Sequence, residues 1–120
     1  MTGSSSRRVL LVEDEMMIAM MLEDMLIDLG HSVVGIAPSL KTALHLAGSE
    51  TFDVAILDIN LAGERSFPVA HLLRERGLPF LFSTGYGSAG LEDPFGAVMT
   101  LKKPYQIDDL ARAVDQIVAD

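Results

Sequence analysis

The side chains of this sequence that could do chemistry together follow short apolar runs. Four apolar residues, 54–57, precede the carboxylate of Asp58, and another apolar run, residues 9–12, is followed at once by Glu13 and Asp14. A run of this kind is typical of a strand buried on both faces of a parallel sheet. Taken alone, an acid such as Asp58 more often caps a helix or faces solvent than forms a site. Whether Asp58 belongs to a site therefore depends on the residues at the ends of the other predicted strands.

Two further predicted strands also end on polar side chains. Thr84 follows residues 78–83, and Lys102 and Lys103 follow residues 97–101. In a right-handed doubly wound sheet, the loops after the strands open on the same rim. The sequence therefore predicts that three carboxylates, a hydroxyl and an ammonium converge from four different strands.

The chemistry of this set follows from its charges. Three neighbouring carboxylates repel one another and favour either a proton or a cation. Because all their ligand atoms are oxygens, we expect a hard ion, Mg²⁺ or Mn²⁺, at Glu13, Asp14 and Asp58. Mg²⁺ favours a phosphate oxygen as a further ligand, so Lys103 is predicted to pair with a phosphate and Thr84 to donate a hydrogen bond to it. An ionised Asp58 beside the metal could act as a nucleophile.

Strands and helices alternate along the chain and would position these residues. We expect strands at residues 9–12, 32–37, 52–58, 78–83 and 97–101. We expect helices at residues 16–30, 39–48, 67–77 and 107–118, and a short helix or irregular stretch at residues 88–94. This alternation predicts βαβ units and an α/β fold, in which helices cover both faces of a parallel sheet.

Composition indicates one folded domain with an acidic surface. The chain has 120 residues, of which 49% are hydrophobic and 22% charged, and its net charge is −8. We assign residues 7–120 to the domain and residues 1–6, which are small and polar, to a flexible tail. The negative charge argues against binding to nucleic acid or to an anionic membrane, and no apolar run approaches a membrane span. The lack of cysteine and of a signal-peptide pattern suits a cytoplasmic protein.

With these residues in place, residues 7–119 resemble the receiver domain of two-component response regulators. The resemblance rests on the acids after Val12, on Asp58, on Thr84-Gly85 and on Lys103-Pro104-Tyr105. It implies a flavodoxin-like, five-stranded parallel sheet of order 2-1-3-4-5. It also implies a single-domain response regulator that accepts a phosphoryl group from a histidine kinase or histidine phosphotransfer protein. Such a protein signals through contacts with a downstream protein, which the sequence does not name, and a homodimer is one possible form.

The resemblance assigns roles to the residues around the acceptor. Asp58 matches the phosphoacceptor and Asp14 the direct metal ligand, while Glu13 matches an acid that reaches the metal mainly through water. Asn60 matches the position whose backbone carbonyl completes the metal shell. The implied metal set is therefore Glu13, Asp14, Asp58 and the carbonyl of Asn60.

The resemblance also addresses the phosphate-binding and switch residues. Thr84 matches the switch hydroxyl, and Lys103, which precedes a proline, matches the phosphate-pairing lysine better than Lys102 does. Receivers usually carry an aromatic residue where this chain has Thr100. Residues 82–87, Phe-Ser-Thr-Gly-Tyr-Gly, resemble the so-called FATGUY signature of an alphaproteobacterial subgroup that also lacks this aromatic. We predict that either Tyr86 or the glycine-containing segment at residues 85–95 carries the signal instead, and that this segment is more mobile than the other helical segments.

Two other functions fit parts of this pattern. A phosphohydrolase with an aspartyl nucleophile would act on a small-molecule phosphate, but it usually has a second acid where this chain has Asn60. A flavin-binding module would need a phosphate loop rich in small residues after the first strand, where Glu13-Asp14-Glu15 stands. We therefore expect a signalling domain that gains and loses its own phosphoryl group rather than a turnover enzyme.

Several other polar or soft residues are expected to have structural roles only. The methionine cluster at residues 16–25 is predicted to be adaptable core filler rather than a binding groove. His31 is expected on a loop or helix surface, and Asp53 is expected to be solvated. Tyr105, just after the proline, is expected to pack against the last helix, with binding to a partner as the alternative.

Overall fold

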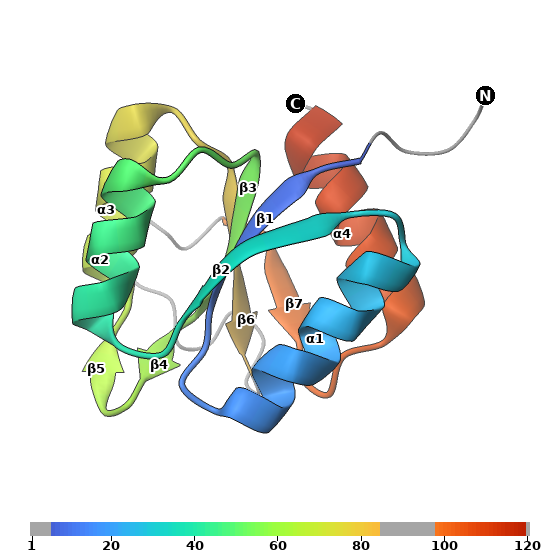
Figure 1. The fold of residues 1–120 in the computed structure, drawn as a ribbon, viewed down its shortest axis with the longest axis horizontal. Helices are drawn as coiled ribbons and strands as arrows, with labels where there is room; N and C mark the ends of the chain where they lie inside the picture. Colours follow the sequence, from blue (N-terminus) through green and yellow to red (C-terminus); the bar gives the residue numbers. More distant parts are fainter. Residues whose placement is uncertain (1–5, 85–97, 120) are drawn as a thin grey trace.

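The computed structural model describes residues 6–84 and 98–119, which form a five-stranded sheet with helices on both sides, together with a separate two-stranded pair (Figure 1). The strands of this sheet are β1 (Arg8–Val12), β2 (Ser32–Ala37), β3 (Val54–Asp58), β6 (Phe80–Thr84) and β7 (Thr100–Lys102). Neighbouring strands are parallel throughout, and their order is β2-β1-β3-β6-β7. Counted along the chain this order is 2-1-3-4-5, so the predicted flavodoxin-like fold is confirmed.

Helices of the described residues cover both faces of the sheet. They are α1 (Met16–Asp28), α2 (Leu40–Ser49), α3 (Phe67–Arg76) and α4 (Ile107–Ala119). Figure 1 shows α2 and α3 on one side of the strands and α1 and α4 on the other. None of them has the length and apolarity needed to cross a membrane. The short helix expected at residues 88–94 and the segment predicted to be mobile at residues 85–95 lie outside the described residues.

Two hydrophobic cores explain why the strand sequences are continuously apolar. Leu10 and Leu57 pack into the core under α2 and α3, whereas Leu11 and Ile56 pack into the core under α1 and α4. Because successive side chains of a strand point to opposite faces, a strand covered on both sides needs an apolar residue at every position. Polar side chains can therefore enter only where a strand leaves the two cores.

The strands on one side of the sheet begin later than predicted. β6 starts at Phe80 rather than at residue 78, and it extends to Thr84. Pro79 has no N–H to donate, which is consistent with ladder pairing that begins at the next residue. β7 runs from Thr100 to Lys102 and so includes the first of the two lysines.

The segment after β3 is more regular than its turn-like sequence predicts. It forms an antiparallel pair of short strands, β4 (Asn60–Leu61) and β5 (Glu64–Arg65). The connecting residues, Ala62 with φ 53° and Gly63 with φ 85°, both have left-handed backbone conformations. Two consecutive left-handed residues make the hairpin turn whose twist matches that of its strands. The expected loop is thus a defined hairpin next to Asp58.

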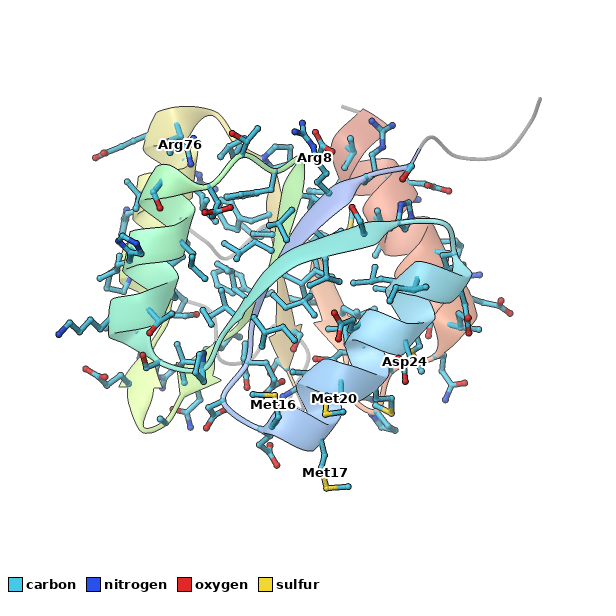
Figure 2. The ribbon with its side chains drawn as sticks, viewed as in Figure 1. Arg8, Met16, Met17, Met20, Asp24 and Arg76 are labelled. Carbon is cyan, nitrogen blue, oxygen red and sulfur yellow. The ribbon has the colours of Figure 1, made fainter. Side chains whose placement is uncertain are left out.

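Most methionines of α1 correct the prediction that they fill the core, although Met25 does pack against the core under α1 and α4. Met16, Met17 and Met20 are exposed, Met17 to 86%. Figure 2 shows these three side chains at the N-terminal end of α1. The buried face of the helix is formed instead around Leu22 and Leu26. Only one stripe of an amphipathic helix contacts the sheet, and the leucines occupy it.

His31, expected on a loop or helix surface, and Asp53, expected to be solvated, are both held at the amino edge of the sheet. His31 is buried, and its Nδ1 accepts a hydrogen bond of 3.0 Å from the backbone N–H of Arg7. Burial lowers the pKa of the His31 imidazole. Asp53 forms an ion pair with Arg8 and its side chain is only 28% exposed. His31 thus lies on a loop as predicted but is buried there, and Asp53 is ion-paired as well as partly solvated, because strand pairing brings distant parts of the chain against these side chains.

Candidate functional site

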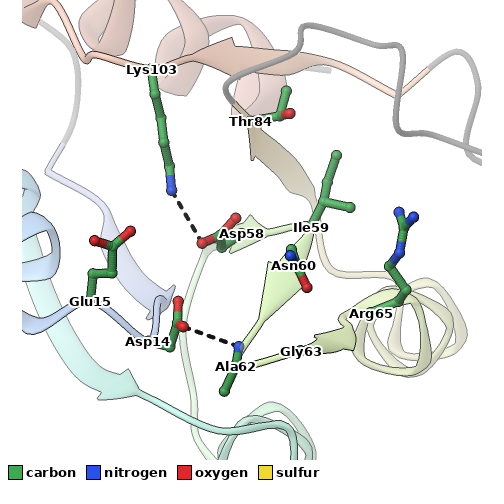
Figure 3. A pocket seen from close by; sticks show the side chains of 10 residues that line it. All are labelled: Asp14, Glu15, Asp58, Ile59, Asn60, Ala62, Gly63, Arg65, Thr84 and Lys103. Carbon is green, nitrogen blue, oxygen red and sulfur yellow. Dashed lines mark hydrogen bonds and ion pairs between the residues drawn. The ribbon is translucent and has the colours of Figure 1, made fainter.

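A pocket of about 450 Å³ opens at the carboxyl edge of the sheet (Figure 3). It is lined by Asp14, Glu15, Asp58, Ile59, Asn60, Ala62, Gly63, Arg65, Thr84 and Lys103. Five of the six predicted site residues are in this lining. The sixth, Glu13, is not in the lining but accepts a hydrogen bond from Lys103, which is. The structure therefore brings together the full set that the strand ends predicted.

Lys103 joins two of the carboxylates. Its Nζ lies 3.1 Å from Oδ2 of Asp58 and 3.1 Å from Oε1 of Glu13. The side chains of these acids are nearly buried, with 11% of Asp58 and 2% of Glu13 exposed, whereas Lys103 is 21% exposed. A single ammonium cannot neutralise two carboxylates, so the ionised cluster keeps a net negative charge at low dielectric.

Backbone N–H groups orient the other carboxylate oxygens. The N–H of Glu15 donates to Oε2 of Glu13 at 3.1 Å, and the N–H of Ala62 donates to Oδ2 of Asp14 at 3.1 Å. One oxygen from each of Glu13, Asp14 and Asp58 lies within 4.8 Å of the others. The β4–β5 hairpin is therefore tied directly to the acid cluster through Ala62.

The charges of the cluster change how its members titrate. Burial is the largest cause that raises the pKa of the Glu13 carboxyl to about 7, and the nearby charge of Asp58 adds to this. The hydrogen bond from Glu15 and the charge of Lys103 act in the opposite direction. Burial by itself would lower the pKa of the Lys103 ammonium. The pKa of Lys103 is nevertheless raised overall by the negative charges around its ammonium. These charges are on Tyr105, once its phenol is ionised, and on Asp58 and Glu13.

Strand geometry decides which lysine reaches the pocket. The backbone N–H of Lys103 donates to the carbonyl of Thr84 at 2.9 Å, and Thr84 is buried. In the β6–β7 register Thr84 is paired with Lys102, which is exposed and does not line the pocket. Successive residues face opposite ways. The structure thus selects Lys103 from the two candidates.

A buried hydroxyl pair near the pocket was missed by the sequence reasoning. The hydroxyls of Ser83 and Tyr105 are 2.6 Å apart. Tyr105 packs in the same core as Leu110 and Val114 of α4, so its predicted contact with the last helix is confirmed. Burial raises the pKa of the Tyr105 phenol to about 12. No residue spacing could have revealed this pair, since β6 and the β7–α4 loop meet only in the folded chain.

Arg65 was also missed. It stands seven residues after Asp58, in a stretch that reads as an irregular turn, and it becomes a wall of the pocket only because the hairpin folds back. Figure 3 shows its side chain across the pocket from Asp14 and Glu15. The Ala62-Gly63 step was the available signal for a two-residue hairpin, but alanine rarely adopts a left-handed conformation.

The acid cluster has the donors that a hard divalent cation needs. Glu13, Asp14 and Asp58 supply only oxygen ligands, and their ligand atoms lie close enough together for one ion. The high pKa of Glu13 and the unbalanced charge show that the cluster gains from either a proton or a cation. The donor set therefore fits Mg²⁺ or Mn²⁺ and not a soft metal.

Comparison with known proteins identifies the family. Residues 9–115 match the response regulator receiver domain. The chain belongs to this family. As a receiver domain it is a component of two-component signalling, and this agrees with the pocket, in which acids, a hydroxyl and a lysine meet at the carboxyl edge of the sheet.

Individual relatives resemble this receiver domain to different extents. The transcriptional regulatory protein PdtaR of Mycobacterium tuberculosis is 32% identical over 94% of this chain and 57% of its own length. The solution structure of SdrG from Sphingomonas melonis Fr1 is 41% identical, covers 92% of this chain and 95% of that chain, and has a TM-score of 0.82. The anti-anti-sigma factor PhyR of Bartonella quintana is 26% identical over 97% of this chain and 49% of that chain, with a TM-score of 0.83. The receiver domain spans about half the length of the curated relatives that it matches.

The two alternative functions have no specific support in the pocket of this receiver domain. A phosphohydrolase would need an acid at Asn60, whose side chain is an amide on the pocket wall. A flavin phosphate would meet the acids Glu13, Asp14 and Glu15, which come directly after β1.

Membership of the FATGUY subgroup stays a prediction, since residues 85–87 of its signature lie outside the described part of the chain. Thr100, at the position where receivers usually carry an aromatic residue, begins the edge strand β7 and pairs with Phe82 of β6.

Proposed function

We propose that Asp58 is the phosphoacceptor of this receiver domain. The observation that carries the proposal is that the Asp58 carboxylate, held at 3.1 Å by Lys103, faces an open pocket among charges that one lysine cannot balance. A carboxylate oxygen of Asp58 attacks the phosphorus of a phosphohistidine donor and forms a P–O bond. The P–N bond breaks, and its electron pair stays on the imidazole nitrogen of the donor.

Lys103 and Thr84 would bind the transferred phosphoryl group. Lys103 already contacts Asp58, so its ammonium can follow the new phosphoryl oxygens with a small movement. Thr84 lines the same pocket from the end of β6 and carries a hydroxyl that can donate a hydrogen bond to a phosphoryl oxygen. A change of contacts at Thr84 and Lys103 would shift the equilibrium between two forms of the surrounding surface.

A divalent cation completes this proposal. Glu13, Asp14, Asp58 and the backbone carbonyl of Asn60 would hold Mg²⁺ or Mn²⁺. When bound, the ion supplies positive charge that stabilises the phosphoryl group during transfer. The residues themselves orient the site, because backbone N–H groups fix Glu13 and Asp14 before any ion arrives.

The phosphodonor would be a histidine kinase or a histidine phosphotransfer protein. Such a donor has to cover the mouth of the pocket, and α1 begins immediately after Glu15, one of the lining residues. The exposed Met16, Met17 and Met20 lie at this end of α1 (Figure 2). Flexible thioether side chains suit a protein surface that has to adapt to a partner. We assign these methionines to the donor-facing surface.

The output would be a contact with another protein. The net charge of −8 disfavours nucleic acid and anionic membranes, and we place the protein in the cytoplasm. The similarity to PhyR, which is described as an anti-anti-sigma factor, supports a downstream protein partner. A homodimer is a further form to test.

We assign residues 7–120 to the receiver domain and residues 1–6 to a tail. We regard the domain as a signalling module that is not a turnover enzyme.

The test is phosphorylation by a small donor, followed by intact mass. Incubation with Mg²⁺ and acetyl phosphate is expected to add one phosphoryl group, and the adduct should be stable in acid and labile in base. Asp58→Asn is expected to abolish the adduct, as is chelation of Mg²⁺. Asp53→Asn is the matched control, because Asp53 stands at the other end of β3 and should leave the adduct intact. An unmodified wild-type mass, or an adduct that persists in Asp58→Asn, would overturn the proposal.

A further inference from the structure

The hairpin after Asp58 carries an arginine into the pocket. The β4–β5 register pairs Asn60 with Arg65 and Leu61 with Glu64. Residues that are directly opposed in an antiparallel pair share one face. Asn60 and Arg65 accordingly both line the pocket, whereas Leu61 is in the core under α2 and α3 and Glu64 does not line the pocket. The register alone therefore orients Arg65 toward the reaction site.

Backbone hydrogen bonds fix the position of this hairpin. The N–H of Ala62 at its turn donates to Oδ2 of Asp14 at 3.1 Å. The N–H of Ser66, the residue after Arg65, donates to the carbonyl of Ile59 at 2.9 Å. The turn and both ends of the hairpin are thus anchored to the residues around Asp58. The backbone of Arg65 is held at a set place relative to the acid cluster.

The charges of the pocket explain what a second cation would do there. Lys103 is shared between Glu13 and Asp58, so its charge is already committed to two carboxylates. A phosphoryl group that enters the pocket brings further negative charge. Among the described lining residues, Arg65 is the other cationic side chain, and it lies across the pocket from Asp14 and Glu15 (Figure 3). Its planar guanidinium can donate two parallel hydrogen bonds to phosphate oxygens.

We propose that Arg65 binds the phosphoryl group of the incoming donor and keeps this contact after transfer to Asp58. The inference rests on the proposed function of Asp58 and adds a substrate-binding residue on the opposite wall of the pocket. Arg65 is exposed at the mouth, so it meets the donor phosphate before Asp58 does. Its contribution is therefore expected in the half-saturating donor concentration more than in the rate at saturation.

The experiment compares Arg65→Gln with the wild-type chain and two controls. Beryllofluoride, a phosphoryl mimic, is titrated in excess Mg²⁺ by calorimetry, and phosphorylation is followed by intact mass against acetyl phosphate and phosphoramidate concentration. We expect the half-saturating concentration of all three to rise about tenfold in Arg65→Gln, with Arg65→Lys in between. Glu64→Gln, a charge change in the same hairpin, and Arg8→Gln, the same substitution at the other edge of the sheet, should match wild type.

The outcomes separate this inference from the function on which it rests. If the half-saturating concentrations in Arg65→Gln equal those of the wild type, the inference about Arg65 is overturned. Asp58 can still be the acceptor in that case, provided that the wild-type protein forms the adduct. A loss with acetyl phosphate alone would also overturn it, because it would place Arg65 on the leaving acetate and not on the phosphoryl group. If Arg65→Gln lowers the midpoint of thermal unfolding but leaves the half-saturating concentrations unchanged, Arg65 has only a structural role and the inference is overturned. Wild-type protein that forms no adduct and binds no beryllofluoride would remove both proposals.

Discussion

Strand β3 has an aspartate at each end, and the two are paired in opposite ways. Asp53, just before the strand, accepts from the backbone N–H of Arg8 at 2.7 Å, from its Nε at 3.3 Å and from its Nη2 at 3.0 Å. Asp58, at the other end, has one lysine contact at 3.1 Å and shares that lysine with Glu13. One acid has a cation of its own, and the other competes for one.

This difference separates a structural ion pair from a candidate binding site. The Arg8–Asp53 pair is locally neutral and partly solvated, so nothing further is needed to satisfy it. The Glu13–Asp58–Lys103 set is nearly buried and unbalanced, so it gains from a proton, a cation or a rearrangement. A cation within 3.1 Å of a carboxylate therefore does not define its role. The balance of charge and the access to a pocket do.

The sharpest way to test this comparison is to remove each cation in turn. Lys103→Met should slow phosphorylation by acetyl phosphate about 100-fold, because it removes a charge that would contact the phosphoryl group in the transition state. Arg8→Met should leave the rate unchanged, since its partner Asp53 is remote from the pocket. Rates are read from the growth of the phosphorylated mass with time. Equal rates in the two variants would contradict the distinction.

The acid cluster and the Arg8–Asp53 pair should also respond to pH with opposite signs. The pKa of Glu13 is raised from 4.5 to about 7, chiefly by burial, so its stabilising contribution is complete below 4.5 and is lost as pH rises to about 7. The side-chain and backbone hydrogen bonds from Arg8 lower the pKa of Asp53 below 3.8, so its contribution is present above 3.8 and is lost in acid.

Denaturant unfolding in the presence of a chelator measures both effects. Between pH 4.5 and 7, the free energy of unfolding of the wild type should fall relative to that of Glu13→Gln. The difference between the wild type and Asp53→Asn should instead shrink only as the pH falls below 3.8. A wild-type curve parallel to that of Glu13→Gln over the whole range would show that Glu13 is already ionised in the folded chain.

The smallest expected effect is on thermal stability without metal. At pH 7.5, Asp53→Asn should lower the midpoint of thermal unfolding by a few degrees at most, because partly exposed ion pairs contribute little. Asp58→Asn should raise the midpoint, because it removes one of the charges that compete for Lys103. Circular dichroism records both. Shifts of the same sign would mean that the two acids are paired alike.

Much of the site could be predicted because its residues stand at strand ends. Asp58 and Glu13 follow apolar runs whose length and continuity are set by burial on both faces. Arg65 and the Ser83–Tyr105 pair could not be found in this way. The first depends on a hairpin turn with an unfavourable left-handed alanine, and the second on the contact between β6 and the β7–α4 loop. The exposed methionines of α1 were misplaced because helical spacing alone does not show which side of a helix meets the sheet.

The sequence by itself determined the order of strands and helices and the acids, hydroxyl and lysine at the carboxyl edge. Those features depend on local rules, namely the period of apolar residues and the place where a buried strand ends. Only the tertiary structure decided how charge is shared at that edge. Whether Lys103 serves one carboxylate or two, whether Asp53 is solvated or paired, and whether Arg65 faces the pocket all depend on contacts between distant segments. Electrostatic balance at low dielectric is set by those distances and not by the order of residues.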